Sequence, residues 1–139
     1  MEIILVSACL LGTNCKYNGK NNKNIKVLEY IKDKYVIPIC PELFGGLSIP
    51  RIPSEIYNNK VIDKDGIDVT NYFMEGARKT LEIAKILNIK KAILKQKSPS
   101  CGCGKIYDGT FTGSITNGDG ITTKILKENG IEVITEDDI

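Results

Sequence analysis

Residues 2–9, EIILVSAC, join a short apolar run to a cysteine, and this unit decides the fold. An apolar run with β-branched residues predicts a buried strand. Two further runs lead into cysteines in the same way: YVIPI at 35–39 precedes Cys40, and KKAILK at 90–95 precedes SPSCGCG at 98–104. The sequence thus predicts three strands, each followed by a loop that carries cysteine.

Helical periodicity separates these strands and follows them, in residues 24–34, 70–88 and 121–129. Asn24 can cap the first of these helices, and Thr70, or Asp68 just before it, can cap the second. Gly130 can end the third helix, after which IEVIT at 131–135 predicts a final strand. Strands that alternate with helices predict an α/β fold with a largely parallel, Rossmann-like sheet and flanking helices.

The connecting segments are predicted from their turn residues. Pro38 indicates that its strand lies at an edge of the sheet or contains a bulge. Residues 40–58 are rich in proline and contain apolar side chains to bury, so we expect a long ordered loop. The segment VIDKDGIDV at 61–69 predicts a short hairpin around Asp65–Gly66. The glycine-rich stretch at 106–120 predicts a loop.

The chain has 139 residues, which is the size of one domain, so we expect a single domain over residues 1–139. It contains five cysteines and no histidine. The absence of imidazole excludes Ser-His-Asp hydrolases, Cys-His proteases, histidine-ligated zinc hydrolases and two-histidine iron sites. Any metal must therefore be bound by thiolates or carboxylates.

Charge and hydropathy indicate the cellular setting. The chain shows no basic, apolar leader at its start and no apolar run of about 18 residues. The cysteine count is odd, so we expect a cytoplasmic protein with reduced thiols and no membrane association. The net charge of +2 comes from 19 basic and 17 acidic residues dispersed along the chain. This distribution favours a small-molecule partner over nucleic acid.

Three cysteines follow strands, and the carboxyl ends of parallel strands meet at one edge of a sheet. We therefore expect Cys9, Cys40 and Cys101 to converge on one rim. A single cysteine is often only a small buried hydrophobe. The chain lacks the C-x-x-C spacing that structural zinc sites and thioredoxin-like dithiols prefer. Dispersed thiols suit an iron-sulfur cluster held at three corners, with one iron open to a substrate sulfur.

Polar side chains next to the cysteines offer proton transfer without histidine. Glu42 lies two residues after Cys40, and Ser98 and Ser100 lie just before Cys101. A carboxylate can exchange a proton with water, and a hydroxyl can relay it. The alternative is that Glu42 caps a turn or forms an ion pair, and that the serines satisfy the loop backbone.

Aromatic residues and glycine-rich stretches bear on which ligand the protein binds. Tyr107 and Phe111 belong to the core or cover a planar ligand, and Asp108 between them belongs to a turn or to the site. Neither of the two glycine-rich phosphate-binding patterns, GxxxxGKS/T and GxGxxG, occurs in the chain. The sequence therefore does not favour nucleotide binding.

Several motifs together carry a resemblance that covers nearly the whole chain. They are SACLLG at 7–12, NCKYNG at 14–19, CPE at 40–42, GGL at 45–47, PR at 50–51, DVT at 68–70, SPSCG at 98–102 and YDGTFTG at 107–113. In this order they resemble the thiouracil desulfidase family, long catalogued as a domain of unknown function. The family motif reads Arg-Tyr-Asp-Gly where this chain has KYNG at 16–19, which removes a charge pair from that loop.

The resemblance implies a small cytoplasmic enzyme that removes sulfur from a thiolated pyrimidine, such as 2-thiouracil, and releases hydrosulfide without net redox change. It implies a 4Fe-4S cluster whose ligands, carried over motif by motif, are Cys9, Cys40 and Cys101. Cys15 also matches a family motif and is the reserve ligand, whereas Cys103 lies at a position that we expect to vary.

The same resemblance implies which residues act on the substrate. Glu42 and one of Ser98 and Ser100 would take part in the chemistry. We further expect Ser7, Tyr107 and Asp108 to contact the substrate.

The sequence is also compatible with two other functions. Four protein thiolates, including Cys15 or Cys103, would close a zinc or iron-sulfur site and make the protein a structural or scaffold module. Alternatively, the sulfur is removed from a thiolated nucleoside or RNA rather than from a free base, in which case binding would depend on salt.

Overall fold

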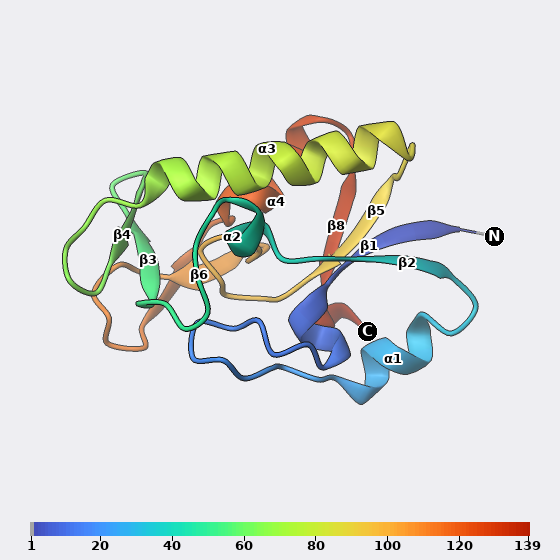
Figure 1. Ribbon diagram of the computed structural model, residues 1–139, viewed down its shortest axis with the longest axis horizontal. Helices are drawn as coiled ribbons and strands as arrows, with labels where there is room; N and C mark the ends of the chain where they lie inside the picture. Colours follow the sequence, from blue (N-terminus) through green and yellow to red (C-terminus); the bar gives the residue numbers. More distant parts are fainter. Residues whose placement is uncertain (1) are drawn as a thin grey trace.

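Strand β1 lies inside a four-stranded parallel sheet with the order β2-β1-β5-β8 (Figure 1). The computed structural model describes residues 2–139. The strands of this sheet are β1 (Ile3–Ser7), β2 (Tyr35–Ile39), β5 (Lys91–Leu94) and β8 (Glu132–Thr135). The register pairs Ser7 with Ile39. The chain segments that begin at Ala8 and Cys40 therefore leave the sheet side by side.

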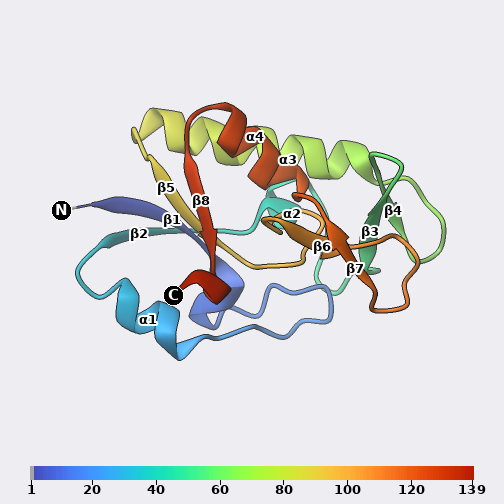
Figure 2. The ribbon, with the colours of Figure 1, turned by 180° about the vertical axis from the view of Figure 1, so that it is seen from behind.

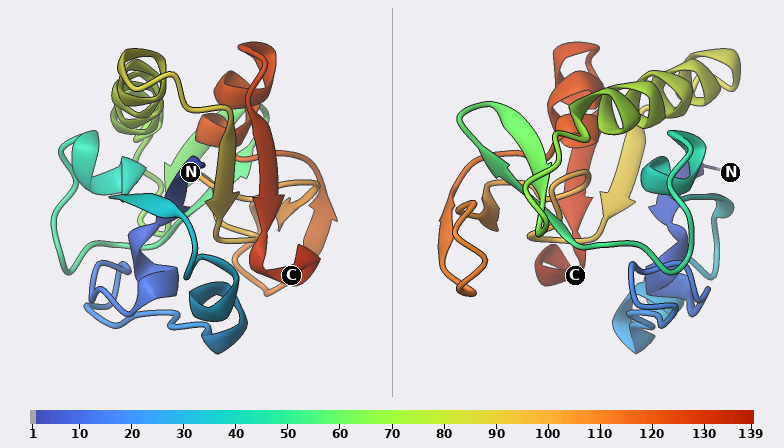
Figure 3. Two further views of the ribbon diagram at one scale, coloured as in Figure 1. Left: turned by 90° about the vertical axis from the view of Figure 1, so that its right-hand side faces the viewer. Right: turned by 60° about the vertical axis from the view of Figure 1, so that its left-hand side comes forward.

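Helices cover both faces of the sheet, as the two views in Figure 3 show. The helices are α1 (Ile25–Tyr30), α2 (Pro41–Phe44), α3 (Thr70–Ile86) and α4 (Ile121–Glu128), with 3-10 turns η1 (Ala8–Leu11) and η2 (Glu136–Asp138). Leu5 and Leu94 pack with Ala84 of α3 and Leu126 of α4. Because side chains alternate along a strand, the other face of β1 packs against α1 and η1. None of the described helices is long and apolar enough to cross a membrane.

Two antiparallel hairpins lie beyond the carboxyl ends of the parallel strands (Figures 1 and 2). One consists of β3 (Ser54–Tyr57) and β4 (Lys60–Asp63), and the other of β6 (Lys105–Tyr107) and β7 (Ile115–Asn117). β3 contacts β6, so the two hairpins stand next to each other. Together they form a wall at the end of the sheet where the cysteine-bearing loops emerge.

A pair of glycines seats α2 against α3. A methyl group on Gly45 would overlap the backbone carbonyl of Tyr72, and one on Gly76 would overlap the carbonyl of Pro41. The two backbones therefore approach more closely than any other residue pair would allow. This contact fixes the position of the short helix that follows Cys40.

The predicted parallel sheet with flanking helices is confirmed, and so are the three longer helices at their predicted places. Asn24 caps α1 by accepting a hydrogen bond from Val27 N at 3.1 Å. Pro38 lies in β2, which is an edge strand of the sheet as predicted.

The predicted short hairpin around Asp65–Gly66 is confirmed, because Ile62 and Asp68 form an antiparallel bridge and Val69 N donates to the carbonyl of Val61 at 2.8 Å. The β3–β4 hairpin was not predicted. It turns at Asn58–Asn59, whose φ angles of 49° and 61° suit the two-residue turn of a twisted hairpin.

Two predictions for the connections were wrong. Residues 40–58 are not one long loop, because Pro41 begins the short helix α2 and β3 follows. The glycine-rich stretch is not only a loop, since it contains the β6–β7 hairpin.

Candidate active site

The cysteine-bearing loops surround a pocket of about 500 Å³ at the carboxyl ends of the parallel strands. Ten residues that the sequence singled out line this pocket: Ser7, Cys9, Cys15, Cys40, Glu42, Ser98, Ser100, Cys101, Tyr107 and Phe111. The structure thus brings the three strand-end cysteines together, and it places Cys15 among them.

Two of the singled-out residues do not line the pocket. The carboxylate of Asp108 accepts hydrogen bonds from the backbone N and the hydroxyl of Thr110, at 3.0 and 2.6 Å, and so belongs to a turn. The Cys103 thiol donates toward the carbonyl of Val133 at 3.7 Å. Both side chains therefore serve local structure outside the pocket.

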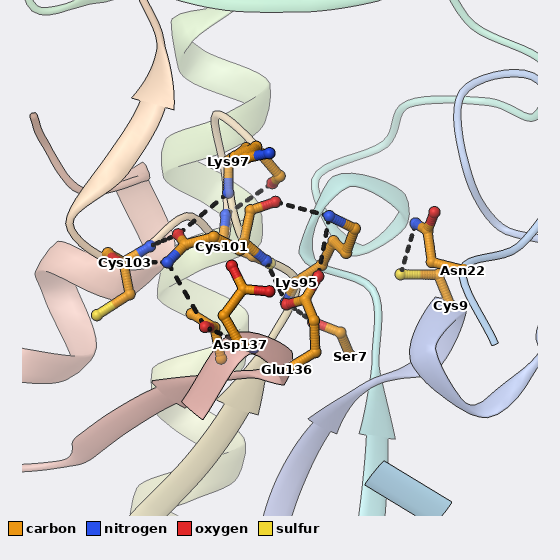
Figure 4. A network of polar contacts seen from close by, with 12 residues as sticks. Ser7, Cys9, Asn22, Lys95, Lys97, Cys101, Cys103, Glu136 and Asp137 are labelled. Carbon is orange, nitrogen blue, oxygen red and sulfur yellow. Dashed lines mark hydrogen bonds and ion pairs between the residues drawn. The ribbon is translucent and has the colours of Figure 1, made fainter. Parts of the chain in front are cut away.

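Cys9 lies in η1, immediately after β1, where its side chain is half-buried. Asn22 Nδ2 lies 3.5 Å from its Sγ, a contact that is seen in Figure 4. The pKa of the Cys9 thiol is lowered to about 7, chiefly by a hydrogen bond from Cys15, with further contributions from Asn22 and the charge of Lys95. The Cys9 thiol therefore ionises more readily than an ordinary cysteine thiol.

Cys40 occupies the N-cap position of α2, with Pro41 at the first helical position. The pKa of its thiol is also lowered to about 7, first by a hydrogen bond from Cys15 and then by the backbone N–H of Leu43. The pKa of Cys15 is raised far above its usual range, because Cys40 and Cys9 both stabilise its protonated form. Cys15 therefore keeps its proton, and its single S–H can donate to one of the two neighbouring sulfurs at a time.

The loop that carries Cys101 is bound to the start of α4. Ser98 Oγ accepts hydrogen bonds from the backbone N of Ser100 at 3.1 Å and of Cys101 at 2.8 Å. The carbonyl of Cys101 accepts a hydrogen bond from Thr123 Oγ1 at 2.8 Å. A side chain on Gly120 would overlap the Ser100 carbonyl, so glycine is required at this close approach. The backbone around Cys101 is therefore held on both sides.

Burial raises the pKa of the Cys101 thiol to about 12, and the charge of Glu42 adds to this effect. Hydrogen bonds from Ser100 and Ser7 to the thiol act in the opposite direction. Ser7 Oγ itself accepts a hydrogen bond from the backbone N of Lys95 at 3.0 Å (Figure 4). The Ser7 hydroxyl is thereby oriented to donate toward Cys101.

Glu42 forms an ion pair with Arg51, which was one of the alternatives drawn from the sequence. Arg51 Nε donates to Glu42 Oε2 at 2.8 Å, and Arg51 Nη2 donates to the carbonyl of Cys15 at 2.9 Å. Both contacts to Glu42 use Oε2, and Oε1 has no hydrogen-bond partner among residues 2–139. The arginine therefore fixes the carboxylate and leaves one oxygen available to the pocket.

Sequence reasoning missed several residues of the pocket wall. Asn22 contacts the Cys9 thiol, and Lys95 brings a positive charge that is paired with Glu136 at 3.0 Å (Figure 4). Glu55 lines the pocket from β3. Only Lys95 carried a signal, because it is the last residue of a predicted strand; Asn22 and Glu55 lie in segments without one.

The thiols around the pocket are soft donors that suit a thiophilic metal group. Within the described range 2–139, no three Cys, Asp or Glu side chains gather closely enough to hold a single metal ion. Thiolates that stand apart around an open space suit an iron-sulfur cluster, in which each thiolate binds a different iron. The residues present therefore fit such a group, with Cys9, Cys15, Cys40 and Cys101 as the available donors.

The fold and the pocket define a class: an α/β domain in which thiols from successive strand ends surround a pocket that also contains a fixed carboxylate. The chain belongs to the 2-thiouracil desulfurase family, whose model matches residues 4–138. The resemblance seen in the sequence motifs is thereby confirmed.

Two known proteins are similar over nearly the whole chain. The uncharacterized protein YbbK of Bacillus subtilis (strain 168) is 44% identical over an alignment of 147 positions that covers 99% of this chain and 97% of YbbK. A solved structure described as the 4Fe-4S-dependent thiouracil desulfidase TudS matches with a TM-score of 0.92 and 39% identity. That match covers 100% of this chain and 93% of TudS.

Proposed function

We propose that this protein is a 4Fe-4S-dependent desulfidase that converts the thiocarbonyl group of a thiolated pyrimidine, such as 2-thiouracil, to a carbonyl group. The observation that carries the proposal is the pocket itself, in which thiols from three strand ends meet the fixed carboxylate of Glu42. Membership of the 2-thiouracil desulfurase family and the match to TudS support it.

In this proposal, Cys9, Cys40 and Cys101 hold the cluster. The lowered pKa values of Cys9 and Cys40 support this role, because metals bind the thiolate and not the thiol. Cys15 remains a protonated neighbour and the reserve ligand. When bound by three cysteines, the cluster supplies an open iron, a soft Lewis acid with affinity for sulfur.

Glu42 activates the water that replaces sulfur. Arg51 holds Oε2 in place, and Oε1 takes a proton from water as the water oxygen forms its bond to the thiocarbonyl carbon. Glu42 then returns this proton to sulfur, the carbon–sulfur bond breaks, and sulfur leaves with the bonding electron pair as hydrosulfide while the added hydroxyl releases its proton to solvent to give the carbonyl group. Water and thiocarbonyl thus give carbonyl and hydrogen sulfide, and no electron donor or acceptor is required.

The two serines have different surroundings, and this supports different roles. Both backbone N–H groups that reach Ser98 Oγ occupy its acceptor positions, so its own O–H can only donate. Ser100 is buried, forms a hydrogen bond with Thr122 Oγ1 at 3.0 Å and supports Cys101. We therefore propose that the Ser98 hydroxyl donates a hydrogen bond to the substrate and that Ser100 positions Cys101.

An assay of the anaerobically reconstituted protein tests the proposal. We expect equal amounts of uracil and sulfide from 2-thiouracil without added reductant. Replacement of Glu42 by Gln should lower kcat by about 100-fold or more, as for loss of a general base. The matched control Glu75→Gln, on the exposed face of α3, should have the same kcat as the wild type.

Three outcomes would overturn the proposal. Undiminished turnover in Glu42→Gln or Cys101→Ser would show that the pocket chemistry is assigned to the wrong residues. Sulfide release that requires a reductant would contradict the non-redox reaction. Sulfide release from 2-thiouridine but not from 2-thiouracil would move the assignment to a nucleoside substrate.

A further inference from the structure

Glu55 is a buried carboxylate in the wall of the pocket to which the chemistry above assigns no role. It lies on β3, in the hairpin wall beyond the parallel sheet, and only 9% of the residue is exposed. It lines the same pocket as the cysteines. A carboxylate removed from water to this extent requires hydrogen-bond donors.

One oxygen of Glu55 binds the loop between β6 and β7. Oε1 accepts a hydrogen bond from Gly109 N at 3.0 Å and another from Phe111 N at 3.1 Å. Phe111 has a φ of 56°, a conformation that a bulky residue rarely adopts. The carboxylate therefore holds a strained loop in place, and with it the side chains of Tyr107 and Phe111 that line the pocket.

The second oxygen has a different environment. Glu55 Oε2 has no hydrogen-bond partner among the residues that the structure describes. In the same range, no fully buried side-chain oxygen lacks a partner. Oε2 therefore keeps access to water, and Glu55 is one of the residues that line the pocket.

We propose that Glu55 Oε2 accepts a hydrogen bond from a ring N–H of the substrate, so that the protein selects heterocycles with a free N–H next to the carbon that carries sulfur. This inference rests on the proposed function and adds the part of the substrate that is recognised. An ionised carboxylate can only accept hydrogen bonds, and a thiopyrimidine offers N–H donors on both sides of its C2 thiocarbonyl. The bond is charge-assisted, and Glu55 is largely buried, so the bond contributes to specificity.

Glu55→Gln is the sharpest variant for this proposal. The amide oxygen can still accept from Gly109 and Phe111, so the loop stays in place. The amide NH2 replaces Oε2 with a donor, which cannot accept from a ring N–H. The variant thus separates the structural bonds of Glu55 from its bond to the substrate.

Asp63 provides a matched control on the neighbouring strand. It is as buried as Glu55, and its Oδ1 also accepts two backbone bonds, from Asp65 N and Ile67 N, both at 2.9 Å. It does not line the pocket. Asp63→Asn therefore reproduces the change in charge and in backbone contacts without altering the pocket.

The test measures KM and kcat of the reconstituted protein for 2-thiouracil and for its 1-methyl and 3-methyl derivatives. In the wild type, a methyl group on the nitrogen that faces Glu55 should raise KM by about 10-fold to 100-fold, as expected for loss of a charge-assisted hydrogen bond. Glu55→Gln should raise KM for 2-thiouracil to a similar extent, with a smaller change in kcat, and should no longer distinguish the methylated form. Asp63→Asn should behave as the wild type.

Calorimetric binding of uracil and the two methyluracils provides a measurement that needs no turnover. The same methyl group should weaken binding to the wild type and have no effect on Glu55→Gln. Equal KM values for all three thiouracils in the wild type, or discrimination that persists in Glu55→Gln, would overturn this inference while the proposed function stands. Selective uracil binding without sulfide release would instead overturn the proposed function.

Discussion

Arg51 connects the fold to the site, and its removal gives a prediction that can be worked out from the structure. Its guanidinium donates to Glu42 Oε2 at 2.8 Å, to the carbonyl of Cys15 at 2.9 Å and to the carbonyl of Ser48 at 3.2 Å. Only 8% of the Arg51 side chain and 16% of the Glu42 side chain is exposed. Arg51→Ala would therefore leave a carboxylate and two carbonyl groups without their donor.

Removal of one partner from a buried ion pair costs about 3–5 kcal/mol, because the remaining charge is no longer compensated. The free oxygen of Glu42 faces the pocket, where water can enter, so we expect the lower end, about 3 kcal/mol. For a domain of this size that loss corresponds to a decrease in Tm of about 10 °C.

Thermal unfolding of the metal-free protein, followed by circular dichroism, measures the effect without the contribution of a bound cofactor. Arg78→Ala is the matched control, because Arg78 pairs with Glu75 and Glu82 on α3 but its side chain is 59% exposed. Exposed ion pairs contribute little to stability, so the control should change Tm by at most about 3 °C. Equal effects of the two substitutions, or a loss below about 1 kcal/mol for Arg51→Ala, would refute the reasoning.

Two further predictions concern α2 and the thiols. Gly76→Ala should lower the free energy of unfolding in urea by about 2 kcal/mol, because the added methyl group overlaps the Pro41 carbonyl. Helix propensity alone would make alanine the more stable residue at this position, so a stabilised variant would contradict the prediction. In the metal-free protein at pH 7, iodoacetamide should modify Cys9 and Cys40, whose pKa values are about 7, at rates that fall as the pH drops below 7. Cys101, with a pKa of about 12, should react only after unfolding; equal labelling of all three by mass spectrometry would be the opposite result.

The parallel sheet could be predicted because each of its strands is an apolar run, as expected for strands buried on both faces. The hairpins gave no such signal. β7 (Ile115–Asn117) has three exposed residues, so its sequence shows no buried face. The β3–β4 turn depends on two asparagines with positive φ, and a sequence that contains many asparagines does not distinguish this pair from the others.

The thiols of the candidate site could be located for the same reason as the sheet. Cys9, Cys40 and Cys101 come just after strands whose common edge was predictable. Cys15 and Arg51 reach the pocket through irregular segments, and Arg51 contacts a carbonyl group 36 residues earlier in the chain. Such contacts depend on how loops fold back in space, and no local pattern of residues encodes them.

In the proposed function three of the five cysteines hold a 4Fe-4S cluster, and metal analysis of cysteine variants measures whether they do. Iron and acid-labile sulfide are measured in the anaerobically reconstituted wild type and in the serine variants of Cys9, Cys40, Cys101 and Cys103. We predict about four iron and four sulfide per chain in the wild type and in Cys103→Ser, and a large loss of both in the other three variants. Zinc in place of iron, or a full cluster in Cys101→Ser, would contradict the account.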